Sequence, residues 1–127
     1  MPPEITYLVA NYNNGCFIKD CLESLHAQTS PAWHCLIGDD GSTDDTAHLL
    51  QAIQDRWPTR VDVISLTQNS GKAEAVRQGM LRALGRRGVC GFWDADLSTP
   101  LSEVVALRAV LAEYPLVEWV WGIRLRA

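Results

Sequence analysis

VCGFWDADLSTP, residues 89–100, is an apolar run that ends in two carboxylates and leads into the start of a helix. The continuous β-branched and aromatic residues of 89–93 predict a short buried strand. Thr99 followed by Pro100 is an N-cap signature, so Asp94 and Asp96 fall in a strand-to-helix loop. Open α/β sheets bind their ligands at the carboxyl ends of strands. We therefore expect the chemistry of this chain in the loop after residue 93.

The pair Asp94 and Asp96 has two interpretations. Their spacing can place both carboxylates on one side of an extended segment, close enough to share a divalent cation. Alternatively, one of them caps the helix that follows, or both are solvated. The apolar strand before them and the helix start after them favour the metal site.

The length and composition indicate a single domain over 1–127. The chain has 127 residues, of which 47% are hydrophobic, which is enough for one core and too little for two domains of typical size. Its formal net charge of -4 argues against nucleic acid as a partner, because the basic clusters are small: Arg86-Arg87 and, at the extreme end, Arg124 and Arg126.

The sequence also predicts a cytoplasmic location and reduced, mostly buried thiols. No apolar run approaches the ~20 residues that span a bilayer, and the N-terminus lacks the charged-then-apolar pattern of a signal peptide. The four cysteines form no Cys-x-x-Cys pair and have no zinc spacing with the histidines. In a longer protein, the same domain can lie at the cytoplasmic face of a membrane.

Apolar runs and amphipathic stretches alternate along the whole chain. Strands are predicted over 5–10, 33–38, 61–66, 89–93 and 117–123, and helices over 17–28, 47–57, 72–84 and 101–114. Ser42 or Thr43 is the expected cap of the second helix. Strands that alternate with helices at this period predict βαβ units. The expected fold class is therefore α/β, with a mainly parallel sheet and helices on both faces.

Two segments carry expectations about burial. The third predicted helix has apolar residues at helical spacing, which predict a buried stripe made of Val76, Met80, Ala83 and Leu84. The last predicted strand, 117–123, is apolar, and no helix follows to cover it. We expect a truncated domain, the amino-terminal part of a larger protein, and self-association through this uncovered strand.

Polar loops follow three of the predicted strands, over 11–15, 39–46 and 94–99. In a parallel sheet the carboxyl ends of strands open on one edge, so these loops and Gly71-Lys72 would share one crevice. It would collect the carboxylates of Asp39, Asp40, Asp94 and Asp96. These acids repel one another unless a divalent cation and a ligand rich in hydrogen-bond donors are bound.

Taken singly, two of these motifs also have plain structural interpretations. Asp39-Asp40-Gly41-Ser42 can be an Asx turn that caps a helix, and Gly71-Lys72 can be a solvated helix start. The latter is no Walker A loop, because the preceding Gly-x-x-x-x spacing and the following Ser or Thr are missing.

The motifs form an ordered set along the chain. The set comprises Asn11-Tyr12-Asn13, Cys21-Leu22-x-Ser24-Leu25-x-x-Gln28-Thr29, Asp39-Asp40-Gly41-Ser42-Thr43-Asp44, Asn69-x-Gly71-Lys72 and Asp94-Ala95-Asp96. It resembles the amino-terminal half of a family 2 glycosyltransferase, over about Ile5 to Arg124. The resemblance implies the GT-A fold, a Rossmann-like three-layer αβα sandwich. The last two motifs and their surroundings are most similar to the polyprenyl-phosphate (dolichyl-phosphate type) hexosyltransferases.

The resemblance implies a donor site in the first two loops. Ala10, Asn11 and Tyr12 would pack on the base and ribose of the nucleotide. Asp40 would hydrogen-bond the base, and Asp39 would support its loop.

The resemblance places the phosphate end of the donor at the other two motifs. Lys72 would approach the diphosphate or the base. Asp94, with Ala95 beside it, would reach the ribose or a metal-bound water, and Asp96 would hold Mg2+ or Mn2+ against the diphosphate. Carboxylate oxygens are the hard ligands that such a cation prefers.

The implied reaction is an inverting transfer of a hexose from a UDP- or GDP-linked donor to a lipid phosphate or a saccharide. A divalent cation stabilises the charge on the departing phosphate as a Lewis acid. An acceptor hydroxyl needs a general base, and we expect that residue and the acceptor site beyond Ala127. Ile123 stands where relatives carry the serine of a Gly-Ser-Arg segment, so contacts of this segment stay unassigned.

Three other functions would explain parts of the same pattern. A phosphohydrolase of the haloacid dehalogenase kind also has Asp-x-Asp after a buried strand, but it needs a downstream lysine and none follows Ser98. A sugar-nucleotide pyrophosphorylase needs a basic loop after the first strand, whereas 11–15 contains no cation. The remaining alternative is a nucleotide-binding or interaction domain that keeps the fold without turnover.

Overall fold

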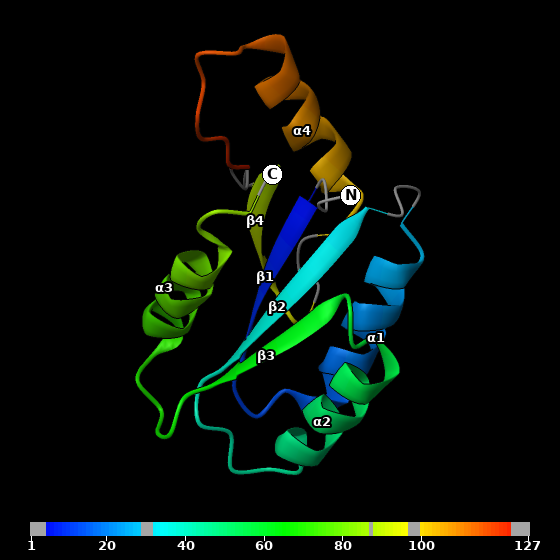
Figure 1. The fold of residues 1–127 in the computed structure, drawn as a ribbon, viewed down its shortest axis with the longest axis vertical. Helices are drawn as coiled ribbons and strands as arrows, with labels where there is room; N and C mark the ends of the chain where they lie inside the picture. The colour runs from blue at the N-terminus through cyan, green and yellow to red at the C-terminus, as the bar shows by residue number, and fades with distance from the viewer. Residues whose placement is uncertain (1–4, 29–31, 87, 97–99, 123–127) are drawn as a thin grey trace, which may run out of the picture.

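The computed structural model describes residues 5–28, 32–86, 88–96 and 100–122. Strands and helices alternate in the order β1 (Ile5–Asn11), α1 (Gly15–His26), β2 (Trp33–Asp39), α2 (Thr46–Arg56), β3 (Val61–Ser65), α3 (Lys72–Ala83), β4 (Val89–Asp94) and α4 (Glu103–Glu113). The strands form one parallel sheet in the order β3-β2-β1-β4 (Figure 1). The predicted α/β class and the first four predicted strands are confirmed.

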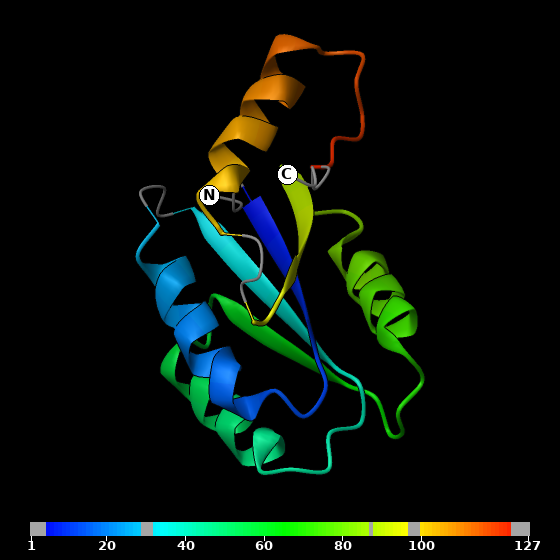
Figure 2. The same ribbon diagram turned by 180° about the vertical axis from the view of Figure 1, so that it is seen from behind.

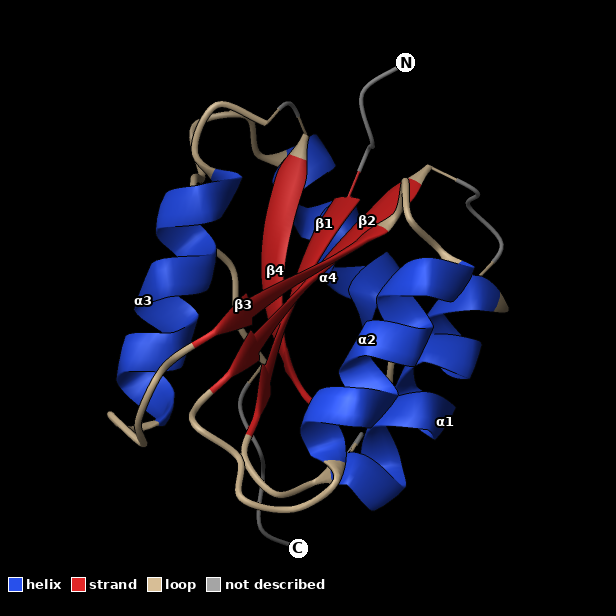
Figure 3. Ribbon diagram, turned by 60° about the horizontal axis from the view of Figure 1, so that its bottom comes forward, coloured by secondary structure: helices blue, strands red, loops and turns tan. Residues whose placement is uncertain are grey.

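Helices cover both faces of the sheet. Figure 3 shows α1 and α2 on one face and α3 on the other, with the sheet as the middle layer. Since side chains of a strand alternate between its faces, Tyr7 packs with Leu22 of α1 in the main core, whereas Leu8 packs with Ala83 of α3. α4 stands apart, beyond the amino ends of the strands (Figures 1 and 2), and of its residues only Val104 is buried.

The buried face of α3 differs from the prediction. Its buried residues are Ala75, Gly79 and Ala83, whereas Met80 is 37% and Leu84 74% exposed. A Cβ on Gly79 would lie 3.2 Å from Leu8 Cδ2, so the helix packs too close to β1 for a large side chain there. Small residues therefore face the sheet. The predicted stripe is confirmed at Ala83, holds in part at the half-buried Val76, and is wrong at Met80 and Leu84. Amphipathic spacing indicates a helix without showing how closely it packs.

The predicted strand over 117–123 is wrong for residues 117–122, and Ile123 lies outside the described residues. Trp119 is 69% and Trp121 74% exposed. Apolar, β-prone residues become a strand only by hydrogen bonding to a neighbouring strand, and none of the described strands pairs with this segment. β4 is therefore, like β3, an edge strand of the described sheet.

The start of α2 also differs from the prediction. The helix begins at Thr46 with Asp45 at its N-cap position, and neither predicted cap occupies that place. Instead, the side chain of Ser42 forms a hydrogen bond with Asp39, and that of Thr43 forms one with Asn13. α4 begins at Glu103, and its predicted cap at residue 99 lies outside the described residues.

Two further observations bear on the environment of the chain. None of the described helices has the length and apolar character needed to cross a membrane. All four cysteines are free. Cys21 and Cys35 are buried as predicted, but Cys16 and Cys90 are exposed. Burial raises the pKa of the Cys21 thiol to about 11, with a smaller contribution from the charge of Asp96.

Candidate functional site

A pocket of about 360 Å3 lies where β1, β2 and β4 end and α3 begins, at the lower edge of the sheet in Figure 1. It is lined by Ala10, Asn11, Tyr12, Asn14, Asp40, Asn69, Gly71, Lys72, Ala75, Asp94, Ala95 and Asp96. The structure thus brings together every site residue predicted from the sequence except Asp39. Asp40 and Asp96, which come from loops far apart in the chain, line the same pocket.

Asp39 does not line this pocket. Its side chain is buried, and its Oδ1 accepts hydrogen bonds from Asn11 Nδ2 at 2.9 Å and Ser42 Oγ at 2.5 Å. The backbone N–H of Ser42 donates to Oδ2 at 3.3 Å. A buried carboxylate needs such donors. Asp39 therefore holds the loop after β2 against the end of β1, rather than facing a ligand.

Asn13 ties the same two loops together from the solvent side. Its backbone N–H donates to Ser42 Oγ at 3.0 Å. In return, its Oδ1 accepts hydrogen bonds from the backbone N–H of Thr43 at 2.8 Å and of Asp44 at 3.3 Å. The φ of Asn13 is +50°, a conformation that asparagine tolerates better than most residues. The rim formed by the loops after β1 and β2 is thus braced without a ligand.

Asp40 joins the loop after β2 to the start of α3. Its buried carboxylate accepts hydrogen bonds from the backbone N–H of Ser70 at 2.7 Å and of Gly71 at 2.9 Å. The next residue, Gly41, has a φ of +72°, and a Cβ there would lie 2.6 Å from the backbone N of Asn69. The close approach of these two loops therefore requires glycine at 41.

Lys72, the first residue of α3, reaches across the pocket to the carboxyl end of β4. Its Nζ lies 2.5 Å from Asp94 Oδ1 and 5.1 Å from the centre of the Phe92 ring. Both members of the ion pair are partly exposed, with side chains 60% and 41% accessible. An ion pair so exposed contributes about 0–1 kcal/mol to stability. It is therefore weak enough to be exchanged for other partners.

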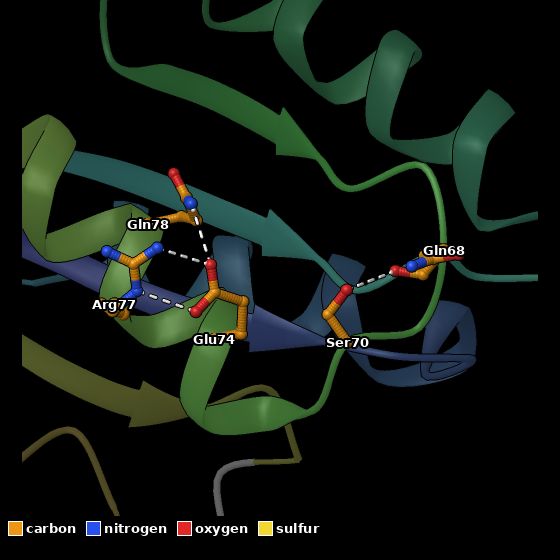
Figure 4. A network of polar contacts seen from close by, with 5 residues as sticks. All are labelled: Gln68, Ser70, Glu74, Arg77 and Gln78. Atoms are coloured by element: carbon orange, nitrogen blue, oxygen red, sulfur yellow. Dashed lines mark hydrogen bonds and ion pairs between the residues drawn. The ribbon is translucent and has the colours of Figure 1, made fainter.

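A second polar network lies on α3 (Figure 4), and its residues Glu74, Arg77 and Gln78 do not line the pocket. The Glu74 carboxylate accepts hydrogen bonds from Arg77 Nε and Nη2, each at 2.8 Å, and from Gln78 Nε2 at 2.9 Å. Hydrogen bonds from Arg77 and then Gln78 lower the pKa of Glu74 to about 2. In the loop before α3, Ser70 Oγ donates to the backbone O of Gln68 at 3.2 Å. The Arg77 cation is thus compensated within its own helix.

The lining includes Asn14, Asn69 and Ala75, which were not predicted as site residues. Asn69 belongs to the Asn-x-Gly-Lys motif, so its position in the sequence could have identified it. Ala75 could not be found in this way, because it depends on how closely α3 approaches β2. A Cβ on Gly38 would lie 3.1 Å from the backbone O of Ala75.

The carboxylates beside Lys72 fit a hard divalent cation in part. Asp94 and Asp96 both line the pocket and offer the oxygen ligands that Mg2+ and Mn2+ prefer. Within the part of the chain that the structure describes, no group of three or more His, Cys, Asp or Glu side chains is placed to hold a metal. A cation here would need further oxygens from water or from a bound ligand, as Mg2+ sites commonly do.

Comparison with known proteins gives a family match and similar sequences. The family model Glycosyl transferase family 2 matches residues 6–116. A glycosyltransferase assigned to teichuronic acid biosynthesis in Bacillus subtilis is 35% identical over 94 residues, covering 74% of this chain and 36% of that protein. The dolichyl-phosphate beta-glucosyltransferase of Saccharomyces cerevisiae is 31% identical over 111 residues, covering 81% and 33%. The chain thus spans about a third of these relatives' length.

Solved structures agree with the sequence match. A mannosyltransferase from Pyrobaculum calidifontis, in complex with GDP-Man and Mn2+, superposes with a TM-score of 0.73 at 25% identity, covering 92% of this chain and 34% of that one. Staphylococcus aureus TarS, in complex with UDP-GlcNAc, superposes with a TM-score of 0.56 at 25% identity, covering 87% and 31%. These neighbours have the predicted GT-A fold.

Proposed function

The chain belongs to glycosyl transferase family 2, and from that premise we propose that it is the donor-binding part of a metal-dependent hexosyltransferase. The observation that carries the proposal is the pocket at the carboxyl ends of β1, β2 and β4. Apart from Asp39, it collects the predicted donor and metal residues from four separate segments, at the ends of β1, β2 and β4 and at the start of α3. Convergence of this kind is expected of a ligand site in an open α/β sheet.

We assign the base and ribose to the side of the pocket formed by β1 and β2. Ala10, Asn11 and Tyr12 line this side, and Tyr12 is 41% exposed, which leaves its ring available to pack on a base. Asp40 is the proposed hydrogen-bonding partner of the base, and Asp39 holds Asn11 in place from behind.

We assign the diphosphate and the cation to the opposite side. Asp94 and Asp96 would hold Mg2+ or Mn2+, with Ala95 between them and Lys72 directed at the diphosphate. The Mn2+ in the complex of the Pyrobaculum mannosyltransferase supports this assignment. Once bound, the cation would supply Lewis-acid stabilisation of the charge on the departing diphosphate.

The proposed transfer inverts the anomeric centre. An oxygen of the acceptor forms a bond to the anomeric carbon, the bond to the diphosphate breaks, and its electron pair leaves with the nucleoside diphosphate. A saccharide hydroxyl gives its proton to a general base, whereas a lipid phosphate is already ionised. Relatives named for dolichyl phosphate and for teichuronic acid support these two acceptor classes. We place the general base and the acceptor site in the two thirds of the relatives' length that this chain does not span.

Calorimetry with UDP- and GDP-sugars, with and without Mn2+, tests the proposal. We expect a nucleotide sugar to bind only in the presence of Mn2+. Asp96→Ala should weaken this binding by about tenfold or more, since a metal ligand is lost. Asp20→Ala, which removes an exposed carboxylate from α1, is the matched control and should bind like wild type. A folded protein that binds no nucleotide sugar under any of these conditions would refute the proposal.

The alternative is a nucleotide-binding domain without turnover. This alternative is favoured by one fact, namely that the chain spans about a third of its relatives' length. Release of nucleoside diphosphate in the presence of a polyprenyl phosphate or a saccharide acceptor distinguishes the two. Binding without release favours the alternative, and acceptor-dependent release excludes it. We also propose a cytoplasmic location, which fractionation of the source cells tests.

A further inference from the structure

Lys72 occupies the position beside Asp94 that the proposed function gives to a divalent cation. Its Nζ lies 2.5 Å from Asp94 Oδ1. It is the one lysine or arginine among the described residues that line the pocket, whereas Asp40, Asp94 and Asp96 all contribute carboxylates. With formal charges, three aspartates and one lysine leave this lining at minus two. Lys72 thus partly balances the negative charge of the pocket.

The backbone next to Lys72 is held by hydrogen bonds, while its side chain is exposed. The two preceding residues, Ser70 and Gly71, donate their backbone N–H groups to the buried carboxylate of Asp40. The Lys72 side chain itself is 60% exposed, and a lysine side chain has four rotatable bonds and a single point charge. Rotation of this side chain can therefore move the ammonium without moving α3.

The charges then predict that the pocket binds the cation and the nucleoside diphosphate together more readily than either one alone. A divalent cation alone must displace the ammonium from Asp94 before it gains that carboxylate. A nucleoside diphosphate alone adds negative charge to a lining that is already negative. When the two arrive together, the cation takes Asp94 and the displaced ammonium finds a new anionic partner in the diphosphate. Each ligand then favours the other, which is a coupling between two ligands in one pocket.

We infer that Lys72 competes with the divalent cation for Asp94 and transfers to the diphosphate when the cation binds with the nucleotide. This inference rests on the proposed function. Lys72 acts in it as a positioning and coupling residue. Its removal should have opposite effects on two ligands, which a merely structural role would not produce.

The test compares Mn2+ binding with nucleotide binding in Lys72→Met. Electron paramagnetic resonance of free Mn2+ measures binding of the metal alone, and we expect the variant to bind it about two- to fivefold more tightly, the range of an exposed ion pair. Calorimetry with UDP and with GDP in the presence of Mn2+ should show about tenfold weaker binding, because a charged hydrogen bond is lost. Weaker or unchanged Mn2+ binding in Lys72→Met would overturn the inference.

Three controls separate the possible causes. Lys72→Arg keeps the positive charge of the side chain and should keep the wild-type preference for Mn2+ and nucleotide together. Lys19→Met makes the same change of net charge at an exposed position of α1 and should alter neither ligand selectively. In an Asp94→Asn background, Lys72→Met should no longer tighten Mn2+ binding, because the competing pair is already broken.

The outcome also distinguishes this inference from the proposed function. If wild type binds neither UDP nor GDP with Mn2+, the proposed function fails and the inference falls with it. If wild type binds them with Mn2+ while Lys72→Met binds Mn2+ no more tightly, the inference alone fails.

Discussion

Asp39 and Asp40 are neighbours in the sequence and have different tasks in the structure. Successive side chains at a strand end point to opposite sides. Asp39 bonds to Asn11 and Ser42, and Asp40 bonds to the two backbone N–H groups before α3. Residue type and spacing alone do not separate the two carboxylates, which are both buried. The resemblance to the family predicts that Asp39 supports its loop and that Asp40 binds the base, and the contacts of Asp39 are those of a loop support.

Gly41 gives a stability prediction at the same scale. Gly41→Ala should destabilise the fold by about 2 kcal/mol, because alanine is strained at positive φ and its Cβ would overlap the next loop. Urea denaturation measures the change. Gly91→Ala is the control, since a Cβ at Gly91 meets nothing within 4 Å. Equal stability of Gly41→Ala and wild type would mean that the two loops are not packed as described.

His34 gives a pH prediction. Burial, and then the charge of Arg86, lower the pKa of His34 below 6.5, and the nearby Asp62 opposes them in part. The unfolded chain therefore binds this proton more readily, and stability falls as the pH drops through about 6.5 toward the lowered value. Urea midpoints between neutral and mildly acidic pH should fall less in His34→Gln than in wild type. Parallel curves for the two proteins would contradict this assignment.

At the scale of elements, the sequence predicted where strands and helices lie better than how they meet. The four paired strands follow from apolar runs such as 33–38 and 89–93, and the shared pocket follows from parallel strands whose carboxyl ends open on one edge. The face of α3 could not be predicted, because Gly79 and Ala75 mark a close approach that spacing does not show. The run 117–122 has strand-forming residues, but strand formation needs a partner, and the sequence does not show one.

The close contact of α3 gives a prediction for the whole helix. Gly79→Leu should lower the free energy of unfolding by about 1–2 kcal/mol, since overpacking against Leu8 outweighs the gain in helix propensity. It should also weaken nucleotide binding, because α3 carries Gly71 and Lys72 into the pocket. Ala73→Leu adds similar bulk to an exposed position of the same helix and should change neither property. Denaturation and calorimetry on the two variants decide between these outcomes.

At the scale of the whole molecule, β4 has an open edge beside an apolar groove. The groove has a volume of about 580 Å3 and is lined by residues of α3, β4, α4 and the segment after it, including Met80, Leu84, Gly91, Leu107 and Trp119. Edge strands with no charged or proline residue are prone to pair with other chains, and β4 has neither before its final Asp94. We therefore propose that self-association uses this edge instead of 117–123.

We predict concentration-dependent association of the purified chain through β4. Cys90→Lys should weaken it, because an exposed charge on the edge opposes strand pairing. Ala52→Lys adds the same charge to an exposed position of α2 and is the control. Light scattering over a range of protein concentrations measures the effect. A wild-type chain that stays monomeric at all concentrations, or an equal effect of the two lysines, would count against association through β4.

The braced rim around Asn13 has a consequence for recognition. In the proposed site, a nucleoside beside β1 would meet loops that are already joined by hydrogen bonds, so its binding would need no prior ordering of these loops. A divalent cation, in contrast, would have to displace the Lys72 ammonium from Asp94. One side of the pocket would thus be ready before its ligand arrives, whereas the other side would depend on the position of a single ammonium group.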